Sequence, residues 1–224
     1  WDGKIRLLNS RNMQVYAGLV YEIQNFCEER GYTLDVDPDL TMTEEFSLAE
    51  AKEFADSLSL PFLPHDHQLR AYALAIRHAR GIFISPTASG KSLIAYLIVR
   101  FYIDNFQSRI LILVPNISLV NLLASDFADY GFDSDAYVHR VFAGQDKIAN
   151  KPVIISTWQS VHELPKSYFE QFDVIIGDEA HLFKAQSLTK IMTNAINVKY
   201  RFGMTGTLDG SVVNELVLTG LFGP

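Results

Sequence analysis

Short apolar runs recur at regular intervals along the larger part of this 224-residue chain and constrain its fold more than any other feature. The clearest runs occupy residues 82–85, 110–114, 153–156 and 174–177, and a weaker one occupies residues 200–204. Apolar runs without polar alternation are typical of strands that are buried on both faces. The helical stretches between them are long enough to return the chain to a neighbouring parallel strand. The pattern predicts an α/β fold with a parallel sheet between helices, in which ligands bind at the carboxyl ends of the strands.

Shorter elements are expected before these runs. Residues 4–8 predict a short strand that follows a turn at residues 2–3, and such a hairpin turn requires a partner strand outside this chain. The next stretch predicts a helix of about 15 residues that ends at Gly31 as its C-cap, with Cys27 on the buried face. Residues 32–36 predict a second short strand. These elements indicate a small α/β domain ahead of the larger one.

An acidic segment joins the two parts. Residues 37–64 are rich in Asp and Glu, contain a helix pattern at 47–58 and are interpreted as a solvated connector. We therefore expect an accessory domain with this connector at residues 1–60 and the larger domain at residues 61–224. Because the chain opens at Trp1 without an initiator methionine, we expect the accessory domain to be truncated at its N-terminus.

Charge and composition exclude some classes of protein. Residues 1–60 carry 5 Lys and Arg against 12 Asp and Glu, whereas residues 61–224 carry 14 basic and 14 acidic residues, so the leading segment holds the whole net charge of −7. A neutral larger domain neither supports nor excludes a nucleic-acid partner. The longest apolar runs have about five residues, far below the roughly 18–20 of a membrane span, so no membrane contact is expected. A single cysteine forms no internal disulfide, which suits a reducing cytoplasm.

A phosphate-binding loop is expected after the first apolar run. Residues 86–92 read Pro-Thr-Ala-Ser-Gly-Lys-Ser and precede a helical stretch, which is the strand–loop–helix context of a P-loop. Backbone N–H groups of such a loop and the helix N-terminus bind phosphate oxygens. Lys91 would reach the β- and γ-phosphates, and the hydroxyl of Ser92 would bind Mg²⁺. Ser85 stands where the first glycine of the pattern belongs, and an ordinary helix start with a serine cap is the alternative. The predicted nucleotide-binding residues of the loop are Ala88, Ser89, Gly90, Lys91 and Ser92.

Two adjacent acids follow a later apolar run. Asp178 and Glu179 end residues 174–177, and two carboxylates at the mouth of a buried strand are unfavourable unless a cation or a proton transfer compensates. In a P-loop enzyme the first acid, Asp178, would bind Mg²⁺. Glu179 would act as the general base for the attacking water. The alternative is a solvated loop in which Asp178 caps a helix.

These motifs resemble those of the superfamily 2 helicases and translocases. Asp-Glu-Ala-His at residues 178–181 resembles motif II, the DEAH box, and residues 86–92 resemble motif I. Further landmarks follow in the family's order over residues 63–208. They are Gln68 as the adenine-reading glutamine, Pro115 and Asn116 in motif Ia, Thr157 and Gln159 as later strand contacts, and Thr205 and Thr207 in motif III.

The resemblance implies a fold, cofactors and partners. It implies a RecA-like domain that binds ATP and Mg²⁺ and holds a nucleic-acid strand mainly through its phosphates. It assigns His181 a catalytic coupling role between the nucleotide and motif III. A second RecA-like domain with an arginine finger is expected in the full-length protein, and that arginine is worth about 10³–10⁵ in rate. We therefore expect this chain alone to bind nucleotide weakly and to be nearly inactive as an ATP hydrolase.

Residues 1–60 are similar to the N-terminal domain of a bacteriophage branch of this superfamily. That similarity implies an ATP-dependent DNA helicase that acts on branched or forked DNA and on RNA–DNA hybrids in recombination, repair and replication. For a phage-encoded protein the expected location is the host cytoplasm. The alternatives are a double-strand DNA translocase or restriction-type motor subunit, a P-loop small-molecule kinase and a non-catalytic docking module.

Three aromatic or histidine positions are assigned structural roles. His65 and His67 are interpreted as an ordinary linker pair, since no nearby carboxylate or thiol would complete a metal site. Trp158 is expected in the core or an interface rather than as a base-stacking platform.

Overall fold

The larger part of the chain forms one parallel sheet. The computed structural model describes residues 7–41, 43, 45–86, 89–207 and 212–224. Six strands are hydrogen-bonded in the order β3-β8-β7-β4-β6-β5, and every pair in this sheet is parallel. The strands are β3 (Arg80–Ile84), β4 (Ile110–Val114), β5 (Val138–Val141), β6 (Val153–Thr157), β7 (Val174–Asp178) and β8 (Tyr200–Thr205). The predicted fold class, a RecA-like sheet between helices, is therefore confirmed.

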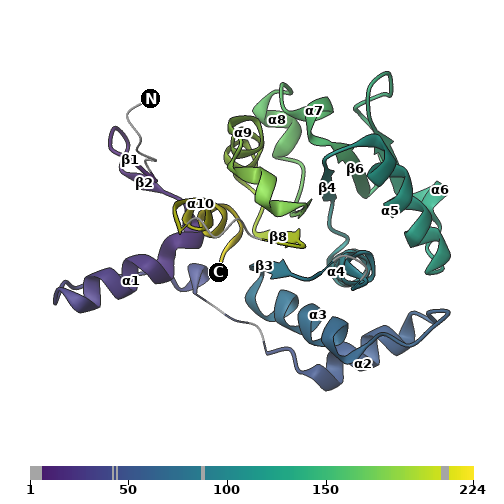
Figure 1. The fold of residues 1–224 in the computed structure, drawn as a ribbon, viewed down its shortest axis with the longest axis horizontal. Helices are drawn as coiled ribbons and strands as arrows, with labels where there is room; N and C mark the ends of the chain where they lie inside the picture. The colour runs from purple at the N-terminus through teal and green to yellow at the C-terminus, as the bar shows by residue number, and fades with distance from the viewer. Residues whose placement is uncertain (1–6, 42, 44, 87–88, 208–211) are drawn as a thin grey trace.

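Helices cover both faces of this sheet (Figure 1). One face packs against α2 (Leu48–Ser57), α3 (Asp66–His78), α4 (Lys91–Phe106) and α5 (Ile117–Asp129). The other face packs against α7 (Trp158–Val161), α8 (Lys166–Phe169), η3 (Ala180–Lys184), α9 (Gln186–Asn194) and α10 (Val212–Phe222). The short helix α6 (Ser134–Tyr137) precedes the edge strand β5.

The central strand β4 explains why the apolar runs lack polar alternation. Ile110 and Ile112 belong to the apolar cluster that contains α4, whereas Leu111 and Leu113 belong to the cluster on the opposite face. All five residues of β4 are buried. Because alternate side chains enter two different cores, each position of the strand must be apolar.

The N-terminal segment differs from the prediction. Residues 4–6 lie outside the described residues, and β1 (Leu8–Asn9) pairs antiparallel with β2 (Gln14–Val15) within the chain. The expected strand at residues 32–36 is wrong, because this stretch forms no strand. Asp35 lies within this stretch and Asp37 directly follows it. Aspartate is poorly suited to strands.

The first helix also packs differently from the prediction. Helix α1 (Val20–Glu29) leaves Phe26 50% exposed and Cys27 only half-buried, so the predicted core face is wrong. The Phe26 ring instead lies under the Arg30 guanidinium, 3.9 Å from its Cζ. The buried anchor is the preceding turn η1 (Ala17–Leu19), which contacts α10.

The predicted connector helix is present and joins the core of the larger domain. Ser47 caps α2, accepting a hydrogen bond from the Glu50 backbone N–H, while the Glu50 carboxylate accepts one from the Ser47 backbone N–H. Ala51 and Ala55 are buried in the same apolar cluster as α3 and α4. Among the described residues, no helix has both the length and the apolar character needed to cross a membrane.

Candidate nucleotide and nucleic-acid site

The phosphate loop and the acidic pair lie at one edge of the sheet. The loop follows β3 and the acids end β7, and both strands pair with β8, which lies between them. A cavity of about 380 Å³ at this edge is lined by Lys91, Ser92, Asp178 and Glu179, with Leu122 of α5 on its apolar wall. The structure thus brings together the lysine and the two carboxylates, as the motif order predicts.

Hydrogen bonds within the phosphate loop hold its lysine. The Lys91 Nζ donates to the carbonyl oxygens of Ser85 (3.0 Å) and Pro86 (3.2 Å). The Ser85 hydroxyl donates to the Ser89 hydroxyl at 2.5 Å, so the serine that replaces the first glycine closes the loop on itself. Ala88, a predicted phosphate contact, lies outside the described residues.

Gln68 lies against this loop. It is 4% exposed, and its Oε1 accepts from the His65 backbone N–H at 2.8 Å. Its Nε2 donates to the Ser89 carbonyl at 3.2 Å. Gly90 has φ +80° and opens α4, and a Cβ on it would lie 2.0 Å from the Gln68 Nε2. Close approach of the two segments therefore requires glycine at position 90.

The His65 and His67 pair also lies at this contact between Gln68 and the phosphate loop. Their rings stack with centroids 5.6 Å apart, and the His67 Nε2 donates to the Ser89 carbonyl at 3.0 Å. Within the described residues, no cluster of three or more His, Cys, Asp or Glu side chains could bind a metal ion.

The acidic pair sits in a strained and poorly solvated turn. Burial, followed by the negative charge of Glu179, raises the pKa of Asp178, and the positive charge of Lys91 opposes this effect. Glu179 adopts φ +53°, a left-handed conformation that costs about 1–3 kcal/mol in a residue other than glycine. The alternative role of Asp178 as a helix cap is wrong, because Glu179 occupies the cap position of η3 and makes no capping hydrogen bond with its side chain.

A short chain of polar contacts connects the acidic pair with the end of β8. The His181 Nδ1 lies 3.3 Å from the Glu179 Oε2 and 2.9 Å from the Thr205 Oγ1. The Thr205 hydroxyl donates to the Thr207 carbonyl at 2.8 Å, so it accepts from His181. The predicted coupling residues are therefore in contact with one another and with the predicted base.

The expected nucleic-acid contacts gather at the ends of β4 and β6. The Gln159 Nε2 donates to the Pro115 carbonyl at 3.1 Å and so links the two predicted motifs. The Asn116 side chain caps α5 by accepting from the Leu119 N–H at 3.0 Å. Thr157 is 5% exposed, and its Oγ1 lies 2.8 Å from the Ser160 Oγ. Asn116 and Thr157 thus have structural partners. Trp158, as expected, packs partly buried on the apolar cluster beneath α9.

One residue at this site was missed by the sequence analysis. The hydroxyl of Tyr130, at the C-terminal end of α5, lies 2.9 Å from the Ser92 Oγ. Tyr130 belongs to no motif, and its distance from Ser92 along the chain gives no sequence signal. Only the packing of α5 beside α4 brings the two hydroxyls together.

Comparison with known proteins agrees with this geometry. A family model described as type III restriction enzyme, res subunit, matches residues 53–210. The chain is 35% identical over 232 residues to the ATP-dependent DNA helicase uvsW of Enterobacteria phage T4, with all of this chain and 46% of that protein covered. It is 27% identical over 157 residues to the DNA 3'-5' translocase XPB2 of Sulfurisphaera tokodaii, with 68% of this chain and 34% of that protein covered. The chain therefore spans half or less of the length of these relatives.

Solved structures share the fold. The crystal structure of the UvsW helicase from bacteriophage T4 superposes with a TM-score of 0.91 at 35% identity, covering all of this chain and 82% of that one. The SWI2/SNF2 ATPase core of Sulfolobus solfataricus superposes with a TM-score of 0.59 at 17% identity, covering 72% of this chain and 36% of that one, which shows the fold alone. The similarity to a phage helicase extends over the first 60 residues, as the sequence predicted. The chain therefore belongs to the type III restriction enzyme, res subunit, family of superfamily 2 helicases, and it is a homologue of ATP-dependent DNA helicases.

Proposed function

We propose that this chain forms the first motor domain of an ATP-dependent DNA helicase that acts on branched DNA and on RNA–DNA hybrids in recombination, repair and replication. The observation that carries the ATP-dependent part of the proposal is the cavity at the carboxyl ends of β3 and β7, which Lys91 lines together with Asp178 and Glu179. The expected accessory domain at residues 1–60, whose connector helix α2 packs into the core of the larger domain, is part of this proposal. A second RecA-like domain in the full-length protein is also part of it.

The residues of the cavity fit a magnesium-bound nucleoside triphosphate. Mg²⁺ prefers hard oxygen ligands and keeps several waters, so the hydroxyl of Ser92 and the carboxylate of Asp178 suffice beside the phosphates. The raised pKa of Asp178 indicates that the protein alone does not fully stabilise the charged carboxylate. A cation beside it would stabilise the charged form. When bound, Mg²⁺ neutralises part of the phosphate charge.

Each residue of the cavity has a distinct task in the proposed reaction. The Lys91 ammonium and the N-terminus of α4 at Gly90 bind the phosphates, and Gln68 recognises the adenine. Glu179 accepts the proton of the attacking water, since a carboxylate in the cavity is within reach of such a water. Protonation changes the charge of Glu179, which lies beside His181. His181 transmits this change to the end of β8 through its hydrogen bond with Thr205.

Nucleic acid is proposed to cross the edge formed by the ends of β4 and β6. Pro115 and Gln159 are hydrogen-bonded there, and backbone groups of Asn116 and Thr157 lie beside them. Because the predicted side chains of Asn116, Thr157 and Gln159 already have protein partners, backbone N–H groups are the better candidates for phosphate contacts. Such contacts carry no sequence information, which suits a motor that moves along any strand.

The test is the ATPase rate of the full-length protein, titrated with duplex, forked and R-loop substrates. The proposal expects branched forms to stimulate hydrolysis more than plain single strands do. Equal stimulation by plain single strands would contradict the branched-DNA assignment. Lys91→Ala should abolish nucleotide binding, and a protein that keeps its cellular activity with this change would be a docking module instead.

A double-strand DNA translocase is the second candidate. It is supported by the 27% identity to a protein named as a DNA 3'-5' translocase. The two candidates differ in their products, because a helicase releases a single strand from a fork whereas a translocase displaces only a bound third strand. Triplex displacement without strand separation would favour the translocase.

A further inference from the structure

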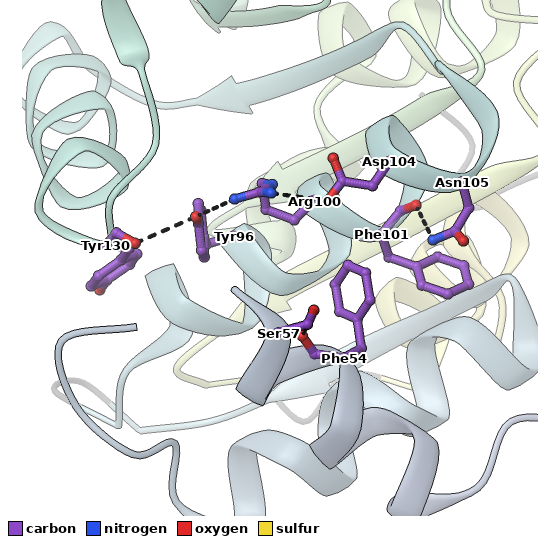
Figure 2. Close-up of polar contacts among 8 residues, drawn as sticks. All are labelled: Phe54, Ser57, Tyr96, Arg100, Phe101, Asp104, Asn105 and Tyr130. Carbon is purple, nitrogen blue, oxygen red and sulfur yellow. Dashed lines mark hydrogen bonds and ion pairs between the residues drawn. The ribbon is translucent and has the colours of Figure 1, made fainter. Parts of the chain in front are cut away.

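A polar chain leads from the phosphate loop to the outer end of α4. The Ser92 Oγ and the Tyr130 hydroxyl are 2.9 Å apart. The Tyr130 carbonyl accepts from the Tyr96 hydroxyl at 3.4 Å, and the Arg100 Nη1 donates to that same hydroxyl at 2.9 Å (Figure 2). The Arg100 Nη2 also donates to the Asp104 Oδ2 at 3.0 Å, which fixes the guanidinium. Tyr130 is thus held at its backbone while its hydroxyl reaches the loop.

Aromatic contacts hold the Tyr130 ring as well. The Phe62 ring meets it edge-on with centroids 5.6 Å apart, and the Tyr96 ring lies 5.3 Å away in a similar edge contact. The Tyr130 backbone N–H donates to the Asp126 carbonyl and so closes the last turn of α5. Ring, backbone and hydroxyl all have partners, so the position of the hydroxyl is set by the fold.

The chemistry of a serine hydroxyl gives this contact a function. A hydroxyl has one proton and two lone pairs, and it binds a metal through a lone pair. If the proton points to a fixed acceptor, the lone pairs of Ser92 face the cavity that also contains Asp178. Outer partners of metal ligands orient those ligands, and their loss costs about 10–100-fold in metal affinity.

We propose that Tyr130 is a positioning residue that accepts the Ser92 proton and so aims the Ser92 hydroxyl at the magnesium ion of the bound nucleotide. This inference rests on the proposed function of the cavity and adds a residue that lies in no helicase motif. Loss of the Tyr130 hydroxyl should therefore lower the affinity for Mg²⁺ and leave the binding of the phosphates by Lys91 unchanged.

The experiment is equilibrium binding of a fluorescent ATP analogue to the full-length protein, titrated with Mg²⁺ and repeated in EDTA. Tyr130→Phe removes the hydroxyl and keeps the ring that packs on Phe62 and Tyr96. We expect the Mg²⁺ concentration at the binding midpoint to rise about tenfold, while binding in EDTA stays unchanged. An unchanged midpoint, or an equal loss of binding with and without Mg²⁺, would overturn the inference.

Two further variants exclude a merely structural effect. Tyr137→Phe removes a hydroxyl from a half-exposed tyrosine on α6 whose ring packs on Phe132, and it should leave the midpoint unchanged. In a Ser92→Ala background, Tyr130→Phe should cause no additional shift, because the tyrosine acts only through that hydroxyl. A further shift in the double variant contradicts this route.

The outcomes also separate this inference from the proposed function. If the unaltered protein binds the analogue and Lys91→Ala abolishes binding, the cavity is the nucleotide site and the Tyr130 result decides the inference alone. If the unaltered protein binds no analogue, the proposed function fails and the inference fails with it.

Discussion

Asp178 reduces the stability of the fold at neutral pH. Its pKa is raised in the folded chain, so folding favours the protonated carboxyl over the charged one. Protonated Asp178 therefore contributes to the free energy of unfolding below the ordinary carboxyl pKa. This contribution is lost as the pH rises through the raised pKa of the folded chain. A charged Asp178 is therefore unfavourable until a cation binds beside it.

Asp178→Asn is expected to stabilise the chain while it abolishes ATP hydrolysis. Thermal denaturation without nucleotide or Mg²⁺ should show a rise in Tm at neutral pH of about 2–4 °C for each kcal/mol gained. The gain should shrink as the pH falls toward the ordinary carboxyl pKa, because the Asp178 carboxyl of the unaltered protein then becomes protonated. Asp56→Asn on the exposed face of α2 serves as the control and should leave Tm nearly unchanged. A lower Tm for Asp178→Asn would contradict the assigned pKa direction.

Gly90 is expected to tolerate no side chain. Its φ of +80° and the 2.0 Å approach of a Cβ to the Gln68 Nε2 both oppose alanine. Gly90→Ala should lower the free energy of unfolding by about 1–3 kcal/mol, measured by urea denaturation. In a Gln68→Ala background the steric part of this loss should disappear and the backbone strain should remain. Equal losses in both backgrounds would mean that the Gln68 contact is unimportant.

At the residue scale, the sequence motifs predict which residues form the nucleotide site, whereas the orientation of Asn116 and the contact of Tyr130 depend on packing. Lys91, Asp178 and Glu179 follow strand ends, and parallel strands carry such residues to one edge, so their meeting could be predicted. The orientation of Asn116 as a helix cap could not, because the same residue type serves caps and nucleic acid alike. Tyr130 depends on the way α5 crosses beside α4, which no local pattern encodes.

At the scale of single elements, the N-cap of α2 offers a direct test of local stability. Ser47→Ala removes the hydroxyl that accepts from the Glu50 backbone N–H, while the backbone N–H of residue 47 can still donate to the Glu50 carboxylate. The loss of this cap should lower the free energy of unfolding by about 1 kcal/mol. Ser57→Ala at the other end of the same helix removes a hydroxyl that donates to the Phe54 carbonyl within the last turn and caps no N–H group, and it should change the stability less (Figure 2). Equal losses of unfolding free energy in the two variants would show that the Ser47 cap stabilises α2 no more than the Ser57 hydroxyl does.

Elements were predictable where burial was uniform. Strand β4 has the predicted bounds, because both of its faces are buried and its sequence is continuously apolar. Edge strand β5 escaped prediction, since His139 and Arg140 at its centre are more exposed and interrupt the apolar pattern. For α1, periodicity suggested a core face, but the short turn η1 provides the anchor against α10 and leaves Phe26 exposed.

At the scale of the whole molecule, this chain is expected to need a second motor domain. The described residues that line the cavity include Lys91 and two carboxylates but no arginine, and the arginine finger is expected from the second domain. The isolated chain should therefore hydrolyse ATP at least about 10³-fold more slowly than the full-length protein, measured as phosphate release with DNA present. A similar rate from the isolated chain would refute the need for a partner domain.

Helix α5 also sets a mechanical relation between two distant groups. Asn116 caps one end, Tyr130 follows the other, and 13 residues make a rod of about 20 Å. A tilt of this rod by about 5° around its middle would move each end by ~1 Å in opposite directions. A displacement of the Asn116 end would therefore move the Tyr130 hydroxyl relative to the Ser92 hydroxyl, because α5 has no hinge or loop between its two ends.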